Sequence, residues 1–289
     1  MTSTNALFME FACRFAEEIK AKAILIYDEV AEDLIKANDS MGCYETVLIT
    51  KKSEEMPEKI RSLVKIISIP GVKVTRLSQI KIAVTKGIAA GFFKKGDKLV
   101  CLTGIPKFGH LDSLFVIDVG KEFEILTSDE SQNIIAGIQP EVFEATLNIA
   151  LELAAQGREG RPVGTIFVVG DHERVMELSR QMIFNPFMGY DEEERNILDE
   201  NLRETIKEFS ALDGAFIVKE NGVLVTAGRH LSAALEGKDF PHGLGSRHIA
   251  AAGITSVTDA IAVVVSESTG TVRLFKKGKI FVNIEKASE

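Results

Sequence analysis

The stretch LDGAFIVKENGVLVTAG (residues 212–228) decides the predicted fold of the second half of the chain. Two runs rich in β-branched and aromatic residues flank Asn221-Gly222, and both residues tolerate the positive φ angles of a type I′ turn. The stretch therefore predicts a β-hairpin. Asp213-Gly214 lies at the mouth of its first strand, where Asp-Gly is also common as a plain helix-to-strand turn.

The segments around this hairpin predict more strands and helices. The run GTIFVVG (164–170) is typical of a buried strand, and Asp171 can cap the helix expected over HERVMELSRQM. A second β pair is expected from AIAVVVSE and TVRLF, followed by a strand at KIFVNI. Apolar spacing predicts helices at 139–156 and 197–209. The second half is thus expected to be a mixed β-sheet flanked by helices.

The first half has a different pattern, in which apolar runs alternate with helix-like segments. The runs are AILIYD, ETVLITKK, VKIISI, DKLVCLTG and DSLFVIDV, and the helix-like segments include AEDLIKA and KIAVTKGIAAGFF. Such alternation predicts an α/β layered domain with a mostly parallel sheet. Polar residues cluster after it, so we expect a domain at 1–125, a linker at 126–138 and a second domain at 139–289.

Composition limits the partners that the chain can have. The 289 residues carry 42 acidic and 34 basic side chains, a net charge of −8, so no overall positive field attracts a nucleic acid. No stretch reaches the roughly 18 apolar residues of a membrane span, and acids interrupt the apolar N-terminus, unlike a signal peptide. We expect a cytoplasmic enzyme or binding protein without nucleic-acid or membrane partners.

The cysteines Cys13, Cys43 and Cys101 are far apart in the sequence and lack the close spacing of a zinc site. We expect them to be buried free thiols, which behave as small apolar side chains.

The stretch GLGSRHIAAAGIT (243–255) is the first candidate binding feature. Gly243, Gly245 and Ser246 precede a helix-forming run, where unpaired N–H groups and the helix dipole favour an anion. The side chains of Arg247 and His248 can donate to phosphate oxygens. A plain helix start would have the same pattern, so the stretch alone leaves both interpretations open.

Two acidic features complete the set. The Asp213 carboxylate could hold a divalent cation or a sugar hydroxyl, and Gly214 would let a base or ribose approach the backbone. After the strand AIAVVV, Ser266 and Glu267 begin the polar segment SESTG, which offers an acid and hydroxyls to a ligand. A polar β-turn would look the same.

The order of these features resembles the diadenylate cyclase (DAC domain) family, over roughly residues 139–289. The resemblance is carried by DGA, then GLGSRH about thirty residues later, then VVVSESTG about twenty residues further on. Residues 5–120 resemble the C-terminal domain of pyruvate kinase, in AKAILIYD and in AVTKGIAAGFFKKGDKLVCLTGIPKFGHLDSLFVIDV. The whole chain is similar to the archaeal type of diadenylate cyclase.

The resemblance implies a nucleotidyltransferase that condenses two ATP into cyclic di-AMP with release of two pyrophosphates, in the presence of Mg²⁺ or Mn²⁺. It implies that Asp213 binds the metal and presents the ribose 3′-hydroxyl, and that Glu267 is a second metal ligand. It implies catalytic roles for Asp213, Arg247 and His248, and ATP-binding roles for Gly214, Ala215, Gly245, Ser246, Arg247, His248, Ser266 and Glu267. The two-fold symmetric product requires two opposed domains, hence a homo-oligomer.

Two positions depart from the family pattern. Ile249 stands where the family commonly has a second Arg, and Ser268 where it commonly has a second Glu. The first change loses a permanent positive charge near the triphosphate, for which Arg229 or Lys238 could substitute. Two alternatives stay open: a nucleotide-binding sensor without turnover, and a first domain that binds a phosphorylated effector while the second is an oligomerisation scaffold.

Overall fold

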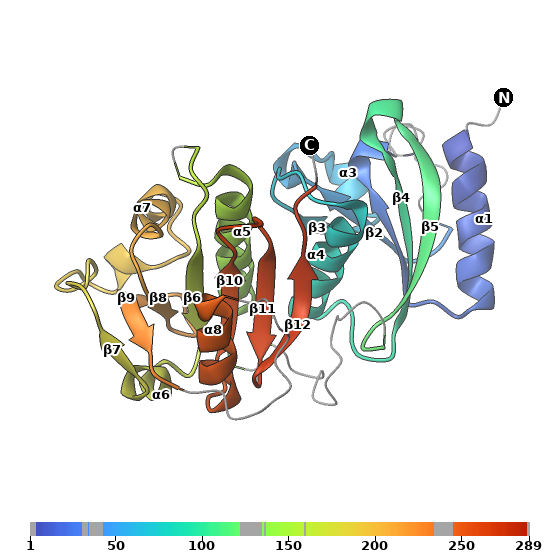
Figure 1. The fold of residues 1–289 in the computed structure, drawn as a ribbon. Coiled ribbons are helices and arrows are strands. Elements are labelled where there is room, and N and C mark those ends of the chain that lie inside the picture. Colours follow the sequence, from blue (N-terminus) through green and yellow to red (C-terminus); the bar gives the residue numbers. More distant parts are fainter. Residues whose placement is uncertain are drawn as a thin grey trace. The chain divides into compact units, whose positions relative to one another are not determined.

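The structure is a computed structural model (Figure 1), in which the chain folds into two compact units. It describes residues 4–30, 34, 43–121, 135, 137–158, 160–233 and 245–287. One unit comprises Met1–Gly71 and Gln79–Gln132, and the other Val72–Ser78 and Asn133–Glu289. Val72–Ser78 thus belongs to the second unit, within which Val74 forms an antiparallel bridge with Lys286.

The first unit is built on a five-stranded sheet in the order β3-β2-β1-β4-β5. All pairs are parallel except β4 with β5, so the predicted mostly parallel sheet is confirmed. The strands are β1 (Ala23–Tyr27), β2 (Thr46–Thr50), β3 (Lys65–Ser68), β4 (Lys98–Ile105) and β5 (His110–Asp118), and the helices are α1 (Thr4–Glu18), α3 (Glu58–Arg61) and α4 (Arg76–Ala89). The helix expected at AEDLIKA lies outside the described residues except for Leu34.

The cysteines of this unit correct one prediction. Cys13 of α1 and Cys43 are joined in a disulfide, with their Cα atoms 6.2 Å apart, so the expectation of free thiols is wrong for this pair. Distance along the sequence does not reveal that the fold brings a helix beside the segment before β2. Cys101 on β4 is a buried free thiol as expected, and burial raises the pKa of its thiol.

The second unit is built on a seven-stranded sheet in the order β12-β11-β10-β6-β8-β9-β7. Only β6 and β8 pair in parallel, so the predicted mixed sheet with hairpins is confirmed. Its strands are β6 (Thr165–Val169), β7 (Ser179–Gln181), β8 (Ala215–Val218), β9 (Leu224–Leu231), β10 (Ile261–Val265), β11 (Val272–Lys276) and β12 (Lys279–Ile284). Its helices are α5 (Pro140–Gln156), α6 (His172–Glu177), α7 (Leu202–Phe209) and α8 (Ser246–Ser256).

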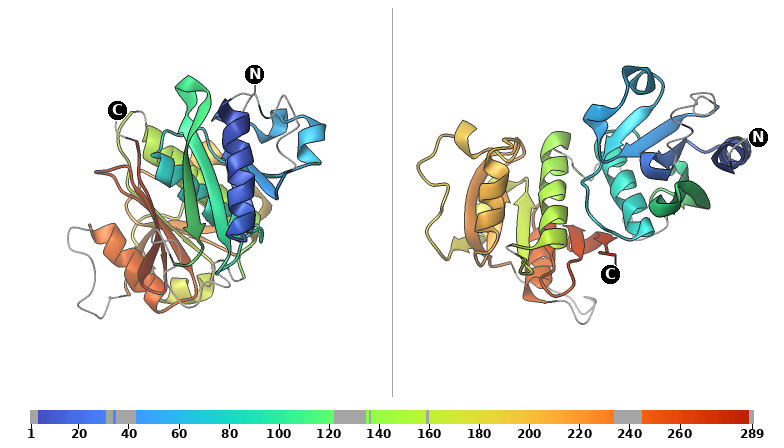
Figure 2. Two further views of the ribbon diagram at one scale, coloured as in Figure 1. Left: turned by 90° about the vertical axis from the view of Figure 1, so that its right-hand side faces the viewer. Right: turned by 90° about the horizontal axis from the view of Figure 1, so that it is seen from above.

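Helices α5 and α8 lie on opposite faces of this sheet (Figures 1 and 2). The α8 face is an apolar layer in which Ala251, Ala252 and Ile254 pack with alternate strand residues such as Ile166 and Val264. Alternation along each strand sends every second side chain into this layer. Burial of this layer fixes α8, and with it the first turn of α8, against the end of the sheet.

Local predictions around the sheet are corrected in detail. The hairpin forms, but of its two turn residues only Gly222 has a positive φ, 93°, so the turn is not type I′; its N–H donates to Lys219 O at 3.0 Å. The helix after Asp171 ends at Glu177, and Asp171 Oδ2 accepts the N–H of Asp259 (2.8 Å) instead of capping. The helix expected from residue 197 begins at Leu202, because the backbone turns at the preceding residues.

Candidate active site

The sheet register gathers three distant segments at one edge of the second unit. Strands β6 and β8 run in parallel and both begin at this edge, whereas antiparallel β10 ends there. Thr165 pairs with Val265, and Ile166 pairs with Ala215. Continuing that register places Asp213, before β8, and Glu267, after β10, on the two sides of central β6, about 10 Å apart at normal strand spacing.

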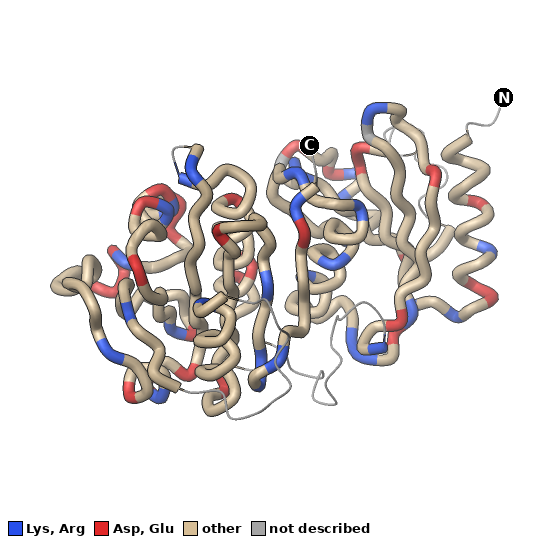
Figure 3. The backbone as a smooth tube through the Cα atoms, in the orientation of Figure 1, with Lys and Arg blue, Asp and Glu red and all other residues tan. Residues whose placement is uncertain are grey.

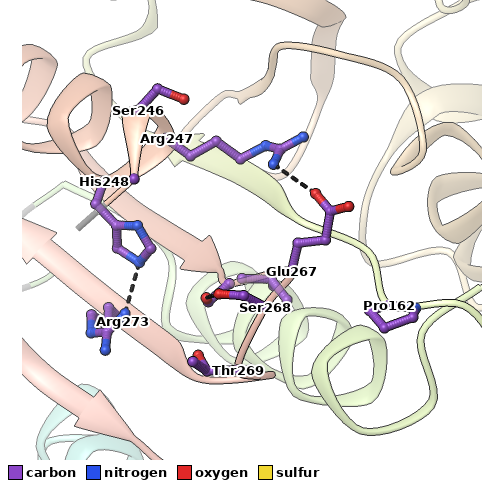
Figure 4. A pocket seen from close by; sticks show the side chains of 11 residues that line it. Pro162, Ser246, Arg247, His248, Glu267, Ser268, Thr269 and Arg273 are labelled. Carbon is purple, nitrogen blue, oxygen red and sulfur yellow. Dashed lines mark hydrogen bonds and ion pairs between the residues drawn. The ribbon is translucent and has the colours of Figure 1, made fainter. Parts of the chain in front are cut away.

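Arg247 joins these two acidic positions. It lies in the first turn of α8, and its Nη1 donates to Glu267 Oε2 at 3.1 Å, as Figure 4 shows, while its Nη2 lies 3.5 Å from Asp213 Oδ1. The Asp213 and Glu267 side chains are 86% and 59% exposed, and that of Arg247 is 33% exposed. Exposed pairs of this kind contribute little to stability, so Arg247 can exchange these partners for a phosphate.

Gly164, directly before β6, lets Arg247 lie across the sheet edge. A Cβ built on Gly164 would lie 2.7 Å from Arg247 Nη1 and 3.0 Å from the Glu267 Cβ. A side chain at position 164 would therefore displace the pair. Gly214 is constrained differently: its φ is +107°, and an added Cβ would lie 2.5 Å from Arg229 N, so the DGA turn requires glycine.

His248, next to Arg247, points to the other side of the same pocket. Its ring is almost wholly buried, and its Nε2 lies 2.9 Å from Arg273 Nη1 on β11 (Figure 4). Burial, together with the charges of Arg273 and Arg247, lowers the pKa of His248 to about 4. The ring is therefore neutral near pH 7.

These groups surround a pocket of about 590 Å³, a size typical of small-molecule sites. Basic and acidic residues are interspersed along both units (Figure 3), so recognition of an anion has to be local. The pocket offers two arginines, hydroxyls and the start of a helix. It is lined by Pro162, Gly245, Ser246, Arg247, His248, Val265, Ser266, Glu267, Ser268, Thr269 and Arg273.

The structure brings together most of the residues predicted from the sequence, but not all. Gly245 is the N-cap of α8, which begins at Ser246, so Arg247 and His248 lie in its first turn. Ala215 is fully buried in the core, so only its backbone could meet a ligand. Gly243 lies outside the described residues.

The positions that depart from the family pattern also have definite surroundings. Ile249 is 46% exposed, and Ser268 lines the pocket with its hydroxyl 3.4 Å from that of Ser266. Arg229 is hydrogen-bonded to Ser179 (Nε to Oγ, 2.8 Å) and is not among the lining residues. Lys238, the other suggested substitute for the missing arginine, lies outside the described residues.

Arg273 is the charged pocket residue that sequence reasoning missed. The run TVRLF was interpreted only as a strand, although it carries a cation directly after the polar segment SESTG. The second residue of β11 lies at the edge where β10 ends, because Val272 pairs with Val265. A charge at the start of an apolar strand beside a candidate site is the pattern that could have identified it.

The protein ligands available to a divalent cation are few. Within the described residues there is no group of three or more His, Cys, Asp or Glu side chains that could hold a metal. Asp213 and Glu267 are two oxygen donors bracketing one guanidinium. Carboxylate oxygens suit a hard cation such as Mg²⁺, which takes one or two carboxylates and completes its shell with substrate phosphates and water. The Arg247 guanidinium lies between these two carboxylates, so it would have to move before both could reach one ion.

The sheet-edge pocket is lined by two arginines and one carboxylate, Glu267, while Asp213 is not a lining residue and lies on the far side of Arg247. Together these groups have the features of a site for a phosphorylated ligand and a divalent cation. A family described as "DisA bacterial checkpoint controller nucleotide-binding" matches residues 152–280, and one described as "Probable sensor domain DacZ_P" matches residues 4–127. No described helix is long and apolar enough to cross a membrane.

Curated relatives extend the match beyond one domain. A diadenylate cyclase of Haloferax volcanii is 37% identical over 207 residues, 72% of this chain and 75% of the relative. A diadenylate cyclase of Methanocaldococcus jannaschii is 44% identical over 189 residues, 65% of this chain and 60% of the relative, so the matched part is less than two thirds of that protein. The chain belongs to the diadenylate cyclase family.

One solved structure also shows similarity. The crystal structure of Staphylococcus aureus DacA, in the form of a double cysteine mutant, is 24% identical, covers 53% of this chain and 87% of that chain, and has a TM-score of 0.35. The likeness of the first unit to pyruvate kinase stays a prediction, as do the domain boundaries and the cytoplasmic location.

Proposed function

We propose that this chain is a diadenylate cyclase that condenses two ATP into cyclic di-AMP and two pyrophosphates. The observation that carries the proposal is Arg247, held between Asp213 and Glu267 at the mouth of a nucleotide-sized pocket in a member of this family. Each ribose 3′-hydroxyl attacks the α-phosphorus of the other ATP. Two P–O bonds form, the two bonds from the α-phosphorus atoms to the oxygens that bridge the α- and β-phosphates break, two pyrophosphates leave, and the two hydroxyl protons pass to solvent.

Such a reaction needs positioning and charge neutralisation more than covalent participation by the protein. In the proposed complex, Arg247 leaves its exposed carboxylate partners and binds phosphate oxygens. The Ser246 hydroxyl and the start of α8 lie beside it and can donate to the same phosphates. Ser266, at the end of β10, is a further hydroxyl at this edge.

Asp213 and Glu267 would hold Mg²⁺ or Mn²⁺, and Asp213 would also orient the attacking 3′-hydroxyl. When bound, the cation supplies positive charge that offsets the charge developing on the phosphate oxygens. Among the residues that the structure describes, no third acidic side chain joins these two in a metal-holding group, and Ser268 stands where the family commonly has a second Glu. The substrate phosphates would therefore be the main remaining ligands. Gly214 and the Ala215 backbone would lie under the adenosine.

The proposed enzyme acts as a homo-oligomer with opposed DAC domains. Each domain binds one ATP, and the product has two-fold symmetry, so two sites must face each other during the reaction. The specific activity should therefore fall when the protein is diluted below the concentration at which it self-associates. Light scattering at the same concentrations checks this; constant specific activity from a monomeric sample would refute the opposed arrangement.

The decisive assay incubates purified full-length protein with ATP and either Mn²⁺ or Mg²⁺, and measures cyclic di-AMP by mass spectrometry and pyrophosphate by a coupled assay. The expected result is two pyrophosphates per cyclic di-AMP. ATP binding without product would instead support the sensor alternative. Repeating the assay without residues 1–125 tests whether the first domain is needed for turnover.

A further inference from the structure

Arg273 and His248 make a contact whose proton positions follow from chemistry. A guanidinium only donates hydrogen bonds and stays protonated in proteins. Because Arg273 Nη1 lies 2.9 Å from His248 Nε2, that nitrogen has to be the acceptor. An imidazole whose Nε2 carries a lone pair has its remaining proton on Nδ1.

The second ring nitrogen, Nδ1, is placed to use that proton. Within the described part of the chain, no protein group forms a hydrogen bond with His248 Nδ1. His248 Nδ1 is not among the fully buried polar atoms that lack a hydrogen-bond partner, so it keeps some solvent access. His248 also lines the pocket. Figure 4 shows Nε2 joined to Arg273 by a dashed line, while the Arg247 side chain extends away from the ring toward Glu267. An N–H on Nδ1 is thus accessible from the pocket.

We propose that Arg273 is a positioning residue that holds His248 as the neutral tautomer with its proton on Nδ1, so that His248 donates a hydrogen bond to a phosphate oxygen of the bound nucleotide. The nucleotide part of this inference rests on the proposed function, whereas the tautomer does not. Arg273 lies on β11, outside the segments that carry the family resemblance. It also adds a permanent positive charge to a pocket in which Ile249 provides none.

The surroundings of His248 favour the neutral ring. The charged groups that act on it among the described residues are Arg247 on its own helix and Arg273 on β11. The Phe275 ring, from the same strand, lies 6.1 Å away between centroids and adds no charge. Burial of the ring, and then the charges of Arg273 and Arg247, oppose imidazolium formation. His248 is therefore a donor with a fixed proton, not a general base that exchanges one.

The first test uses the full-length protein without nucleotide. Nitrogen-15 NMR of the histidine rings, assigned by the loss of one ring signal in His248→Gln, should show His248 protonated on Nδ1 with no titration between pH 5.5 and 8. In Arg273→Met, the His248 pKa should rise above its wild-type value but stay below the ordinary value of about 6.5, because burial, the largest cause of the low pKa, remains; the tautomers should mix. A wild-type His248 protonated on Nε2, or titrating above pH 6, would overturn the proposal.

The second test measures, at several pH values, the ratio of the ATP affinity of each variant to that of wild type. The titration of ATP itself affects both proteins equally and cancels in this ratio. Arg273→Met should bind about tenfold more weakly at pH 8. The ratio should move toward one as the pH falls, because the variant's His248 gains a proton at a higher pH than wild type and its imidazolium attracts phosphate. Arg273→Lys, which keeps a charged donor, should recover most of the loss. A loss that is equal at every pH, with the His248 signals unchanged, would mean that Arg273 acts only as a charge.

Melting temperatures of the variants show whether they fold; if Arg273→Met does not, the wild-type NMR titration and Arg273→Lys still decide. The expected His248 signals without cyclic di-AMP formation would refute the proposed function but leave the tautomer assignment intact. Cyclic di-AMP formation with the opposite tautomer would refute only the role of Arg273.

Discussion

The two arginines of the pocket differ in what holds them. Arg247 contacts exposed carboxylates at 3.1 and 3.5 Å, whereas Arg273 contacts an almost wholly buried imidazole at 2.9 Å. Solvent screens the first set of contacts, so those partners can be exchanged. The second contact lies where a lost hydrogen bond is costly. One side of the pocket can therefore rearrange around a ligand, while the other is set before the ligand arrives.

The largest effect is expected from Asp213→Asn, on the side that can rearrange. The amide keeps the shape but loses the charge that the proposed mechanism uses to bind the metal and orient the 3′-hydroxyl, so cyclic di-AMP formation should fall at least about 1000-fold. Asp213 is exposed, so the circular dichroism spectrum and melting temperature should match wild type. Product formation at the wild-type rate would remove Asp213 from the mechanism.

Arg247→Ala should come next, with ATP affinity and turnover each lower, and an overall loss of about 100-fold in kcat/KM. Arg247→Lys is the matched control, because it keeps the charge but not the bidentate geometry. Its kcat/KM should lie between those of wild type and Arg247→Ala. Calorimetric titration with ATP and the mass-spectrometric assay measure both quantities. Unchanged ATP affinity in the Ala variant would mean that Arg247 does not leave its carboxylates for phosphate.

The buried His248 ring, which contacts Arg273, should make the stability of the protein depend on pH. The folded-state pKa of His248, about 4, lies below the unfolded value of about 6.5, so its contribution is present above pH 6.5 and lost as the pH falls toward 4. Between pH 7 and pH 5 this loss amounts to roughly 2 kcal/mol in the free energy of unfolding. The free energy of unfolding, measured by urea denaturation, should fall more steeply between pH 7 and pH 5 for wild type than for His248→Gln. Parallel pH dependences would contradict a depressed His248 pKa.

The smallest effect is expected from Gly164→Ala, which sharpens the comparison by disturbing only Arg247 and Glu267. The added methyl group would push the end of a flexible side chain, so the melting temperature should change by no more than about 2 °C while kcat/KM falls roughly three- to tenfold. Gly71→Ala is the control, because a Cβ there has no atom within 4 Å. Equal activity of the two variants would show that Arg247 tolerates displacement.

The sequence predicted the Arg247 side of the pocket better than the side formed by Arg273 and His248. Asp213, Arg247 and Glu267 each lie in a motif at the end of a recognisable strand or helix, and strand register then brings them together. Arg273 has no motif. Its role depends on the pairing of β10 with β11 and on the direction of the His248 ring, which are properties of the folded chain.

The errors in the predicted fold have a similar origin. The strands and the hairpin followed from local pattern, but the turn at Asn221-Gly222 is shaped by the wider loop, in which only Gly222 adopts a positive φ. Asp171 had the residue type of a helix cap, yet its carboxylate bonds the distant Asp259 N–H. Cys13 and Cys43 form a disulfide although they lie 30 residues apart in the sequence, and composition alone does not reveal that pairing. Local propensity predicts elements, whereas these contacts depend on tertiary structure.

The central place of β6 has a consequence for how the protein acquires activity as it folds. Its two neighbours, β8 and β10, come from later parts of the chain, and roughly 90 residues separate the end of β6 from the start of β10. Closing so long a loop is entropically costly and slow compared with forming a hairpin. A chain emerging from the ribosome can build the β8–β9 hairpin early, but it has no pocket until β10 and β11 have been synthesised and have docked. Any ligand of this pocket can therefore bind only late, after β10 and β11 have joined the sheet.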